Sequence, residues 1–209
     1  MRKEVIKYLV ISIMIIVFFI GMGFGLFRYY SRELPPLSEL QSYEMKVGSE
    51  VYDRNDNLIH IFYVEKRQLT HLNELPDYLK KGMLAVEDKN FYKHWGMDQL
   101  GLIRAIIVDV MKGDFSQGAS TITQQLARNM FLSLDKQIPR KIKELILAIR
   151  IEKNFSKDEI LEMYFNKSPF GPGLYGIEVG AKKYFGIEAK DLSIPQAALL
   201  IGMPQLPSA

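Results

Sequence analysis

Two adjacent acidic residues, Glu87 and Asp88, have side chains that could do acid–base chemistry. They follow the apolar run Met83-Leu84-Ala85-Val86, which predicts a helix that ends near them. Carboxylates at the carboxyl end of a helix are disfavoured by the helix dipole, so this placement needs a reason. One reason is a role as general acid or base, and the other is local capping or pairing. These two residues alone leave both interpretations open.

A third acidic residue, Glu144, lies among cations. Arg140 and Lys141 precede it by four and three residues, so the three side chains share one face of a helix. Lys136 lies just before this helix, and Arg128 lies near the end of the preceding one. The ordinary interpretation is a solvated helix face with an ion pair. The alternative is an anion site in which cations contact phosphate and surround Glu144.

A glycine turn leads into a polar helix start at residues 117–125, which read Gln-Gly-Ala-Ser-Thr-Ile-Thr-Gln-Gln. Free N–H groups and hydroxyls at such a start can bind an anion or a sugar. Thr121 and Gln124 also have the spacing of a capping box, so a plain capped helix would show the same pattern.

Composition argues against several other kinds of site. The chain has no cysteine, which removes disulfides, thiolate nucleophiles and thiolate metal ligands. It has only three histidines, at positions 60, 71 and 94, so no metal site is expected, and His94 should pack or form hydrogen bonds. The net charge of +3 is too small to indicate a nucleic-acid partner.

The amino-terminal segment has the pattern of a membrane anchor. Leu9–Phe27 contains no charged residue, and at about 1.5 Å per residue it nearly crosses a hydrocarbon core of about 30 Å. A cleaved signal peptide is the alternative, but the run is long and no small-x-small cleavage site follows it. Arg2, Lys3 and Lys7 precede the run, which predicts a cytoplasmic amino terminus with the remaining chain on the other side of the membrane.

The rest of the chain is predicted to be mainly helical. Residues 31–48 contain Pro35 and Pro36 and should form a linker, and residues 49–53 and 58–63 should form a β-hairpin. The predicted helices run from about Asp77 to Lys89, from near Asp98 to Gly113, from Ser120 or Thr121 onward, from Pro139 to about Lys153, from Ser156 onward and from Ser193 onward. Glycine and proline at residues 169–173 predict a loop.

Five ordered motifs together resemble the family 51 glycosyltransferases, the peptidoglycan polymerase domain of class A penicillin-binding proteins and of monofunctional transglycosylases. The motifs are Glu87-Asp88-x-x-Phe91-x-x-His94-x-Gly96; residues 117–126, with Ser120, Thr121, Gln124 and Gln125; Arg140-Lys141-x-x-Glu144; residues 160–166, ending at Asn166, with Gly171-x-Gly173-x-Tyr175-Gly176; and Ala197-Ala198-Leu199-Leu200 with Pro204-Gln205-x-Pro207-Ser208. Any one of these motifs is weak, whereas five in order after an apolar segment are specific.

The resemblance implies a lysozyme-like, mostly helical domain over residues 49–209, with a small hairpin and a lobe beside the membrane. It would follow an anchor at residues 1–30 and a linker at 31–48. Residues 166–170 depart from the family pattern, which is more apolar there. Family members usually continue beyond the position of Ala209 with a further helical segment. The chain could therefore be a short monofunctional enzyme or a domain truncated at its carboxyl end.

The resemblance also implies an activity, the polymerisation of lipid II into glycan strands with release of undecaprenyl pyrophosphate. Glu87 matches the catalytic acid/base, which would take the proton from the acceptor's 4-hydroxyl. Glu144 matches the second active-site glutamate, which orients cationic groups and the leaving group. Arg128, Lys136, Arg140 and Lys141 fall where the family binds pyrophosphate, and Ser120 and Gln125 fall where it contacts substrate.

The resemblance implies a bacterial inner-membrane protein with an extracytoplasmic domain. Its partners would be lipid II, the growing glycan strand, the membrane, and a transpeptidase or proteins of the divisome or elongasome. No cofactor is required by the sequence, although the resemblance allows a divalent cation, Mg or Mn, near the pyrophosphate. Two alternatives stay open, a lytic enzyme of the same broad fold and a non-catalytic membrane scaffold. The cations around Glu144 argue against the first, and the presence of both glutamates argues against the second.

Overall fold

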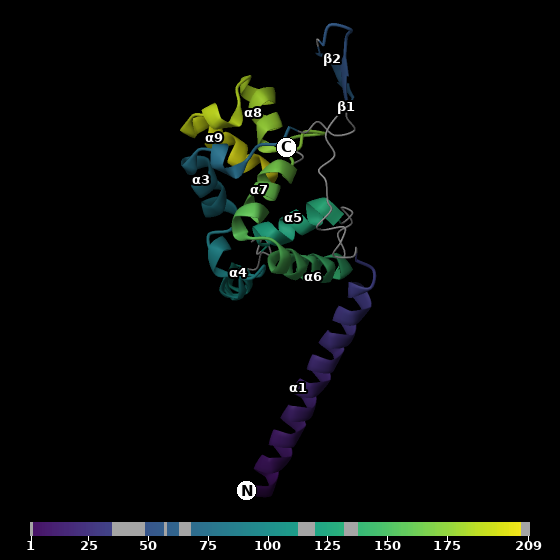
Figure 1. Ribbon diagram of the computed structural model, residues 1–209. Coiled ribbons are helices and arrows are strands. Elements are labelled where there is room, and N and C mark those ends of the chain that lie inside the picture. The colour runs from purple at the N-terminus through teal and green to yellow at the C-terminus, as the bar shows by residue number, and fades with distance from the viewer. Residues whose placement is uncertain are drawn as a thin grey trace.

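The amino-terminal apolar segment forms one long helix, α1, over Arg2–Ser31 (Figure 1). The computed structural model describes residues 2–34, 49–56, 58–62, 68–112, 120–131 and 138–205. Within α1, Ile6–Ser31 is long and apolar enough to cross a membrane, and its most apolar stretch is not buried against protein. The prediction that Leu9–Phe27 forms a continuous apolar helix of spanning length is therefore confirmed.

The remaining described chain is mainly helical, as predicted (Figure 1). Its helices are α3 at Asp77–Glu87, α4 at Gln99–Lys112, α5 at Ile122–Phe131, α6 at Ile138–Asn154, α7 at Lys157–Lys167, α8 at Ile177–Phe185 and α9 at Ile194–Gly202. Short 3-10 turns occur at Leu72–Glu74, Phe91–Lys93, Ala189–Asp191 and Met203–Gln205.

Local signals in the sequence explain most helix ends. Ser156 starts α7 and Ser193 starts α9, and each forms the capping box that satisfies free N–H groups at a helix start. Helix α3 ends at Glu87 rather than at Lys89, because Asp88 leaves the helical conformation. Helix α8 was missed, because Gly176 precedes it without a side-chain cap. Gly113 lies outside the described residues.

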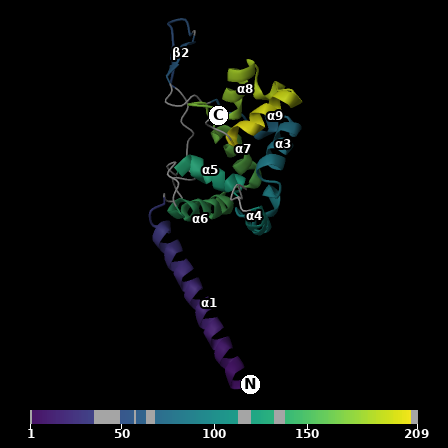
Figure 2. The same cartoon turned by 180° about the vertical axis from the view of Figure 1, so that it is seen from behind.

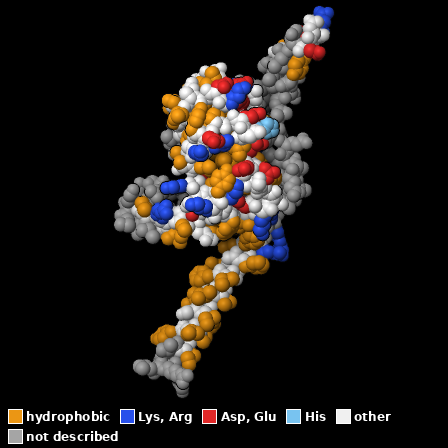
Figure 3. Space-filling view, turned by 60° about the vertical axis from the view of Figure 1, so that its left-hand side comes forward, with side chains coloured by type: hydrophobic (Ala, Val, Ile, Leu, Met, Phe, Trp, Pro, Cys, Tyr) orange, Lys and Arg blue, Asp and Glu red, His pale blue; other side chains and the backbone are white. Residues whose placement is uncertain are grey.

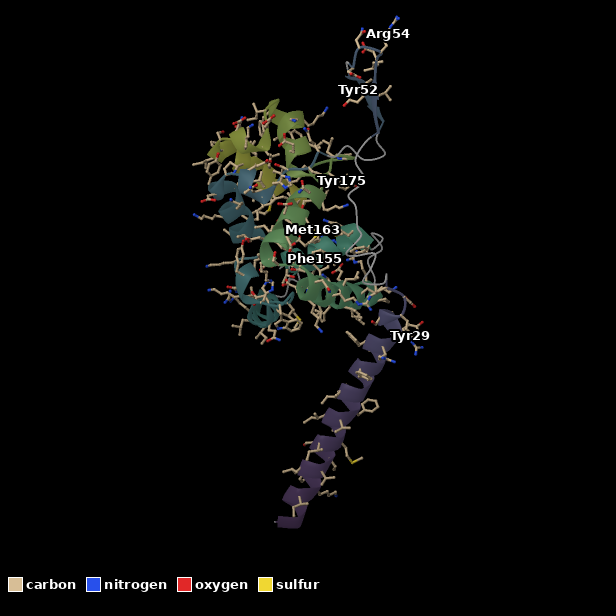
Figure 4. The ribbon with its side chains drawn as sticks, in the orientation of Figure 1. Tyr29, Tyr52, Arg54, Phe155, Met163 and Tyr175 are labelled. Atoms are coloured by element: carbon tan, nitrogen blue, oxygen red, sulfur yellow. The ribbon has the colours of Figure 1, made fainter. Side chains whose placement is uncertain are left out.

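The predicted hairpin consists of β1 at Ser49–Tyr52 and β2 at Leu58–Phe62, which pair antiparallel with an irregularity between Val51 and Tyr52. In the connecting turn, the Asn55 backbone N–H donates to Asp53 Oδ1 at 2.7 Å. The hairpin stands away from the helical body in both views (Figures 1 and 2), and so do the side chains of Tyr52 and Arg54 (Figure 4). Residues 57 and 63 lie outside the described residues.

Helix α5 is central to the core. It packs against both α6 and α7, while α3 packs against α9. Leu126 of α5, Leu147 of α6 and Phe165 of α7 are fully buried. Helices α3 and α9 approach closely, since a Cβ at Gly82 would lie 2.7 Å from the Ile201 Cδ1 atom. The core therefore fixes α5 relative to α6 and α7, and the hydrogen bond from the Ile122 N–H to Asp88 joins its start to the end of α3.

The end of α1 is attached to α6. Arg150 Nη2 donates to the Ser31 carbonyl oxygen at 3.0 Å and to Ser31 Oγ at 2.6 Å. Lys143 forms an ion pair with Glu33 at 2.6 Å and lies over the Tyr30 ring. Helices α4 and α6 lie on the side of the helical body from which α1 leaves (Figures 1 and 2). This is the side on which a lobe beside the membrane was expected.

Candidate active site

Glu87 has one carboxylate oxygen held by a donor and the other buried without a described donor. It is the last residue of α3 and is half-buried. Gln125 Nε2 donates to Glu87 Oε2 at 2.8 Å. Glu87 Oε1 is buried and accepts no hydrogen bond from the residues that the structure describes. A buried carboxylate oxygen is costly unless a donor reaches it, so this atom is suited to receive a hydroxyl from a bound substrate.

The Gln125 amide connects Glu87 to a buried tyrosine. Tyr164 Oη donates to Gln125 Oε1 at 3.1 Å, and the Tyr164 side chain is fully buried in α7. Burial raises the pKa of the Tyr164 hydroxyl above its ordinary value, and the nearby charge of Glu87 raises this pKa further. Tyr164 therefore remains a hydrogen-bond donor, which fixes the amide oxygen towards α7 and the amide nitrogen towards Glu87.

Asp88 has a different environment from its neighbour. Its Oδ2 accepts the backbone N–H of Ile122, the first residue of α5, at 3.0 Å. His94 Nε2 lies 2.9 Å from both oxygens of Asp88, and His94 Nδ1 accepts the Gly96 backbone N–H at 3.1 Å. The unfavourable position at the end of α3 is thus offset, because the same carboxylate lies at the start of α5.

Other residues of the first two motifs also connect the segment after α3 to the start of α5. Thr121 Oγ1 donates to the Gly96 carbonyl at 2.8 Å and accepts the Gln124 backbone N–H at 3.2 Å, so it caps α5 as predicted. Gly96 has φ +101°, and a Cβ there would lie 3.3 Å from the Ala148 backbone. Phe91 is buried under the Lys157 ammonium. These residues hold α3, α5 and α6 together around Glu87.

Glu144 lies between two cations, as the spacing predicted. Its Oε2 is 2.7 Å from Lys141 Nζ, and its Oε1 is 3.1 Å from Arg140 Nε. The Arg140–Glu144 contact is an ion pair only, because the Arg140 Nε–H is not aligned for a hydrogen bond with Oε1. The Glu144 side chain is 1% exposed, whereas that of Lys141 is 51% exposed. Lys141 Nζ also donates to Ser120 Oγ at 2.7 Å. The cluster therefore carries a net positive charge with an accessible ammonium group.

Both glutamates are thus connected to one element. Ser120 lies just before α5 and contacts the Glu144 cluster through Lys141, while Gln125 lies within α5 and contacts Glu87. Arg128 lies in the last turn of α5, and its charge opposes, to a smaller extent, the rise that burial causes in the pKa of Tyr164. Lys136 lies outside the described residues. Figure 3 shows several Lys and Arg side chains on the part of the helical body nearest α1.

The fourth motif shapes a loop and fixes a neighbouring segment. Asn166 Nδ2 donates to the Thr70 carbonyl at 2.9 Å, and the Thr70 N–H donates to Asn166 Oδ1 at 3.0 Å. A Cβ at Gly176, where φ is +94°, would lie 3.2 Å from the Asn166 carbonyl oxygen. The predicted loop is confirmed, and its remaining motif residues are Gly171, Gly173 and Tyr175, the last of which pairs with Pro169.

Tyr164 lies within the fourth motif, but the sequence assigned it no role of its own. It is one of several apolar and aromatic residues that point inward from α7, together with Leu161 and Phe165. Its spacing is that of an ordinary core residue, so no sequence signal shows that its hydroxyl faces Gln125. Met163 and Phe155, also from this region, lie on the helical body in Figure 4 and are only partly buried.

The chain resembles a known family and several known proteins over most of its length. A model of the transglycosylase family matches residues 55–209. Penicillin-binding protein 1A of Neisseria lactamica is 42% identical over 177 residues, which are 85% of this chain and 22% of that protein. The proteins of the same name from Vibrio cholerae and Escherichia coli are each 40% identical over 206 residues, which are 99% of this chain and 25% and 24% of theirs. The chain therefore spans about a quarter of the length of these relatives.

Proposed function

The chain belongs to the transglycosylase family, and we propose that it is a peptidoglycan glycosyltransferase that polymerises lipid II into glycan strands and releases undecaprenyl pyrophosphate. Its mainly helical fold fits the lysozyme-like domain of this family. The observation that carries the proposal is the Glu87 carboxylate, with one oxygen held by Gln125 and the other without a described donor.

Glu87 acts as the general base. The 4-hydroxyl of the acceptor sugar gives its proton to Glu87 Oε1 while its oxygen forms a bond to the anomeric carbon of the growing strand. The bond between that carbon and the pyrophosphate oxygen breaks at the same time. A sugar hydroxyl is a poor nucleophile, and a positioned base contributes about 10²–10⁴-fold to such a reaction.

Lys141 and Arg140 stabilise the leaving group. Negative charge develops on the pyrophosphate as its bond to the sugar breaks, and fixed cations stabilise that charge. The exposed ammonium of Lys141 is held by Glu144 and Ser120, so its position is set before the substrate binds. Glu144 therefore orients the cations, and its own oxygens already face them.

Support for the proposed membrane arrangement comes from α1 and from the basic residues that precede its apolar stretch. We place the anchor at residues 1–30, the linker at 31–48 and the catalytic domain at 49–209, with a cytoplasmic amino terminus and the domain outside the bacterial inner membrane. The contacts of Arg150 with Ser31 and of Lys143 with Glu33 attach the start of the linker, directly after the anchor, to α6, the helix that carries the pyrophosphate cluster. This attachment suits a substrate whose pyrophosphate lies at the membrane surface. Protein partners are expected among transpeptidases and proteins of the divisome or elongasome.

A divalent cation, Mg or Mn, does not enter this mechanism. Among the residues that the structure describes, no group of three or more His, Asp or Glu side chains is placed to hold a metal ion. Glu144 faces Arg140 and Lys141, and their charges oppose a further cation beside it. The described surroundings of Glu144 therefore favour an anion over a metal ion.

The test is polymerisation by the purified chain in liposomes that contain fluorescent lipid II. We expect long glycan products from the wild-type chain and none from a Glu87→Gln variant that melts at a similar temperature. Shortening of pre-formed glycan, without polymer, would assign a lytic activity instead. No change in either substrate would indicate a scaffold and overturn the proposal.

A further inference from the structure

We propose that Tyr164 is a positioning residue for the reaction: its hydroxyl fixes the side-chain amide of Gln125, which holds the Glu87 carboxylate in the orientation that leaves Oε1 for the acceptor hydroxyl. This inference rests on the proposed function, because Glu87 is the general base there. It also gives Gln125 a role other than the substrate contact that the family resemblance implies.

The three groups form one chain of hydrogen bonds from three helices. Tyr164 of α7 donates to Gln125 of α5 at 3.1 Å, and Gln125 donates to Glu87 of α3 at 2.8 Å. An amide has its donor and its acceptor on opposite sides, so each end of Gln125 must meet the matching group. The carboxylate accepts and cannot donate, and the buried tyrosine stays protonated and donates. Both ends are satisfied in only one of the two amide orientations.

This chain of hydrogen bonds gives the two oxygens of Glu87 different roles. Gln125 engages Oε2, which prevents rotation of the carboxylate about its last bond. Oε1 then points away from this donor and remains buried without a described partner. Without the tyrosine hydroxyl the amide is held at one end only, so the carboxylate samples orientations in which neither oxygen faces the acceptor.

The simpler explanation is that Tyr164 is a core residue whose hydroxyl bonds the nearest amide. A buried tyrosine hydroxyl usually finds a partner, and Tyr164 is fully buried. The two explanations differ in what they predict for Tyr164→Phe, which keeps the ring and removes only the hydroxyl. A structural role changes stability alone, whereas a positioning role changes the chemical step while substrate binding is kept.

Tyr184 offers a matched control. Its hydroxyl donates to the Phe170 carbonyl oxygen at 2.8 Å, in the loop built by the fourth motif. Tyr184→Phe therefore removes one tyrosine hydroxyl and one hydrogen bond on the same domain, without touching Gln125 or Glu87. We expect this variant to polymerise lipid II at the wild-type rate after correction for any loss of folded protein.

The experiment measures kcat and KM for lipid II with full-chain Tyr164→Phe, Gln125→Met, the double variant and Tyr184→Phe in liposomes. We expect kcat to fall about 3- to 10-fold in Tyr164→Phe and about 10- to 100-fold in Gln125→Met, with KM little changed. In the double variant, Tyr164→Phe should add no further loss, because its effect passes through Gln125.

Three outcomes would overturn the inference. They are an unchanged kcat in folded Tyr164→Phe, a rise in KM alone in Gln125→Met, and additive losses in the double variant. If Tyr164→Phe does not fold, the kcat and KM of Gln125→Met still decide whether the amide positions the base. Failure of the proposed function would look different, since the wild-type chain itself would then make no polymer.

Discussion

Glu87 and Glu144 are the same residue type, and both are connected to α5, but their surroundings differ. Glu87 receives one neutral amide donor on one oxygen and leaves the other oxygen without a described donor. Glu144 has a cation beside each oxygen and is almost completely buried. Oε1 of Glu144 also accepts no described hydrogen bond, but Arg140 Nε lies 3.1 Å from it, so a fixed cation faces this oxygen where Glu87 Oε1 has none described beside it. In the proposed mechanism, these partners, and not the residue type, make Glu87 the base and give Glu144 the orienting role.

Asp88 extends the comparison to a third carboxylate. It is adjacent to Glu87 in the chain, yet both of its oxygens face His94, and one also accepts the first N–H of α5. Its contacts join three segments of the fold. Substitutions at Glu87, in the Glu144 cluster and at Asp88 should therefore affect different quantities. A change at Glu87 should mainly affect the chemical step, a change in the Glu144 cluster the stabilisation of the leaving group, and a change at Asp88 the stability of the fold.

The largest effect is expected for Glu87→Gln. The substitution keeps the size of the side chain but removes the group that accepts the proton, so polymerisation should fall by at least about 10²–10⁴-fold. Melting temperature and lipid II binding should stay close to those of the wild type. Single-turnover polymerisation measures the loss, with Asp88→Asn as the neighbouring control. Chain formation by Glu87→Gln beside an inactive, folded Asp88→Asn would move the base to Asp88.

The next effect is expected for Lys141→Ala. The ammonium is half-exposed, so its removal should cost little stability, but a charge-assisted contact to phosphate is worth about 1.5–3 kcal/mol. The value of kcat/KM for lipid II should therefore fall about 10- to 150-fold. Lys153→Ala, which removes an exposed lysine from the same helix, is the matched control. Wild-type polymerisation by Lys141→Ala at limiting substrate would contradict the pyrophosphate assignment.

The comparison also shows which features a sequence can predict. Short-range patterns predicted the Glu144 cluster, because Arg140, Lys141 and Glu144 share one helix turn. They also predicted the caps at Ser156 and Ser193. In contrast, the contacts of Glu87 with Gln125, and of Gln125 with Tyr164, join residues 38 and 39 positions apart in the chain. Such contacts depend on how three helices pack, and no local spacing encodes that packing.

Asp88→Asn should mainly reduce stability. An asparagine oxygen at the Oδ2 position can still accept the Ile122 N–H and the His94 Nε2–H, but the NH₂ group that replaces Oδ1 would face Nε2–H, a donor that it cannot bond. His94 cannot move its proton to Nδ1 without losing the Gly96 N–H bond. One buried donor is left unsatisfied, which costs about 1–3 kcal/mol of the free energy of unfolding. Urea denaturation of Asp88→Asn and Glu87→Gln in the same detergent measures the difference, and equal stability of the two would contradict the structural role.

The smallest effect is expected at a fourth carboxylate, Asp98, which precedes α4 and is held by Asn90 and Gly101. Its Oδ2 accepts Asn90 Nδ2 at 2.8 Å, and its Oδ1 accepts the Gly101 backbone N–H at 2.9 Å, as a helix cap does. Asp98→Ala should lower the free energy of unfolding by about 1 kcal/mol. Polymerisation by the folded variant should be unchanged, so a loss of kcat would show that the cap also supports the site.

The pH dependence of this effect has a definite sign. The hydrogen bond from Asn90, followed by that from Gly101, holds the pKa of Asp98 below its ordinary value of 3.8. The folded state therefore favours the ionised carboxylate, and its contribution to stability is present above that ordinary value and decreases as the pH falls through the lowered pKa. The stability difference between wild type and Asp98→Ala should stay constant from neutral pH down to about pH 5 and then shrink with further acidification. Urea denaturation at several pH values checks this, and a difference that grew with acidification would contradict the cap assignment.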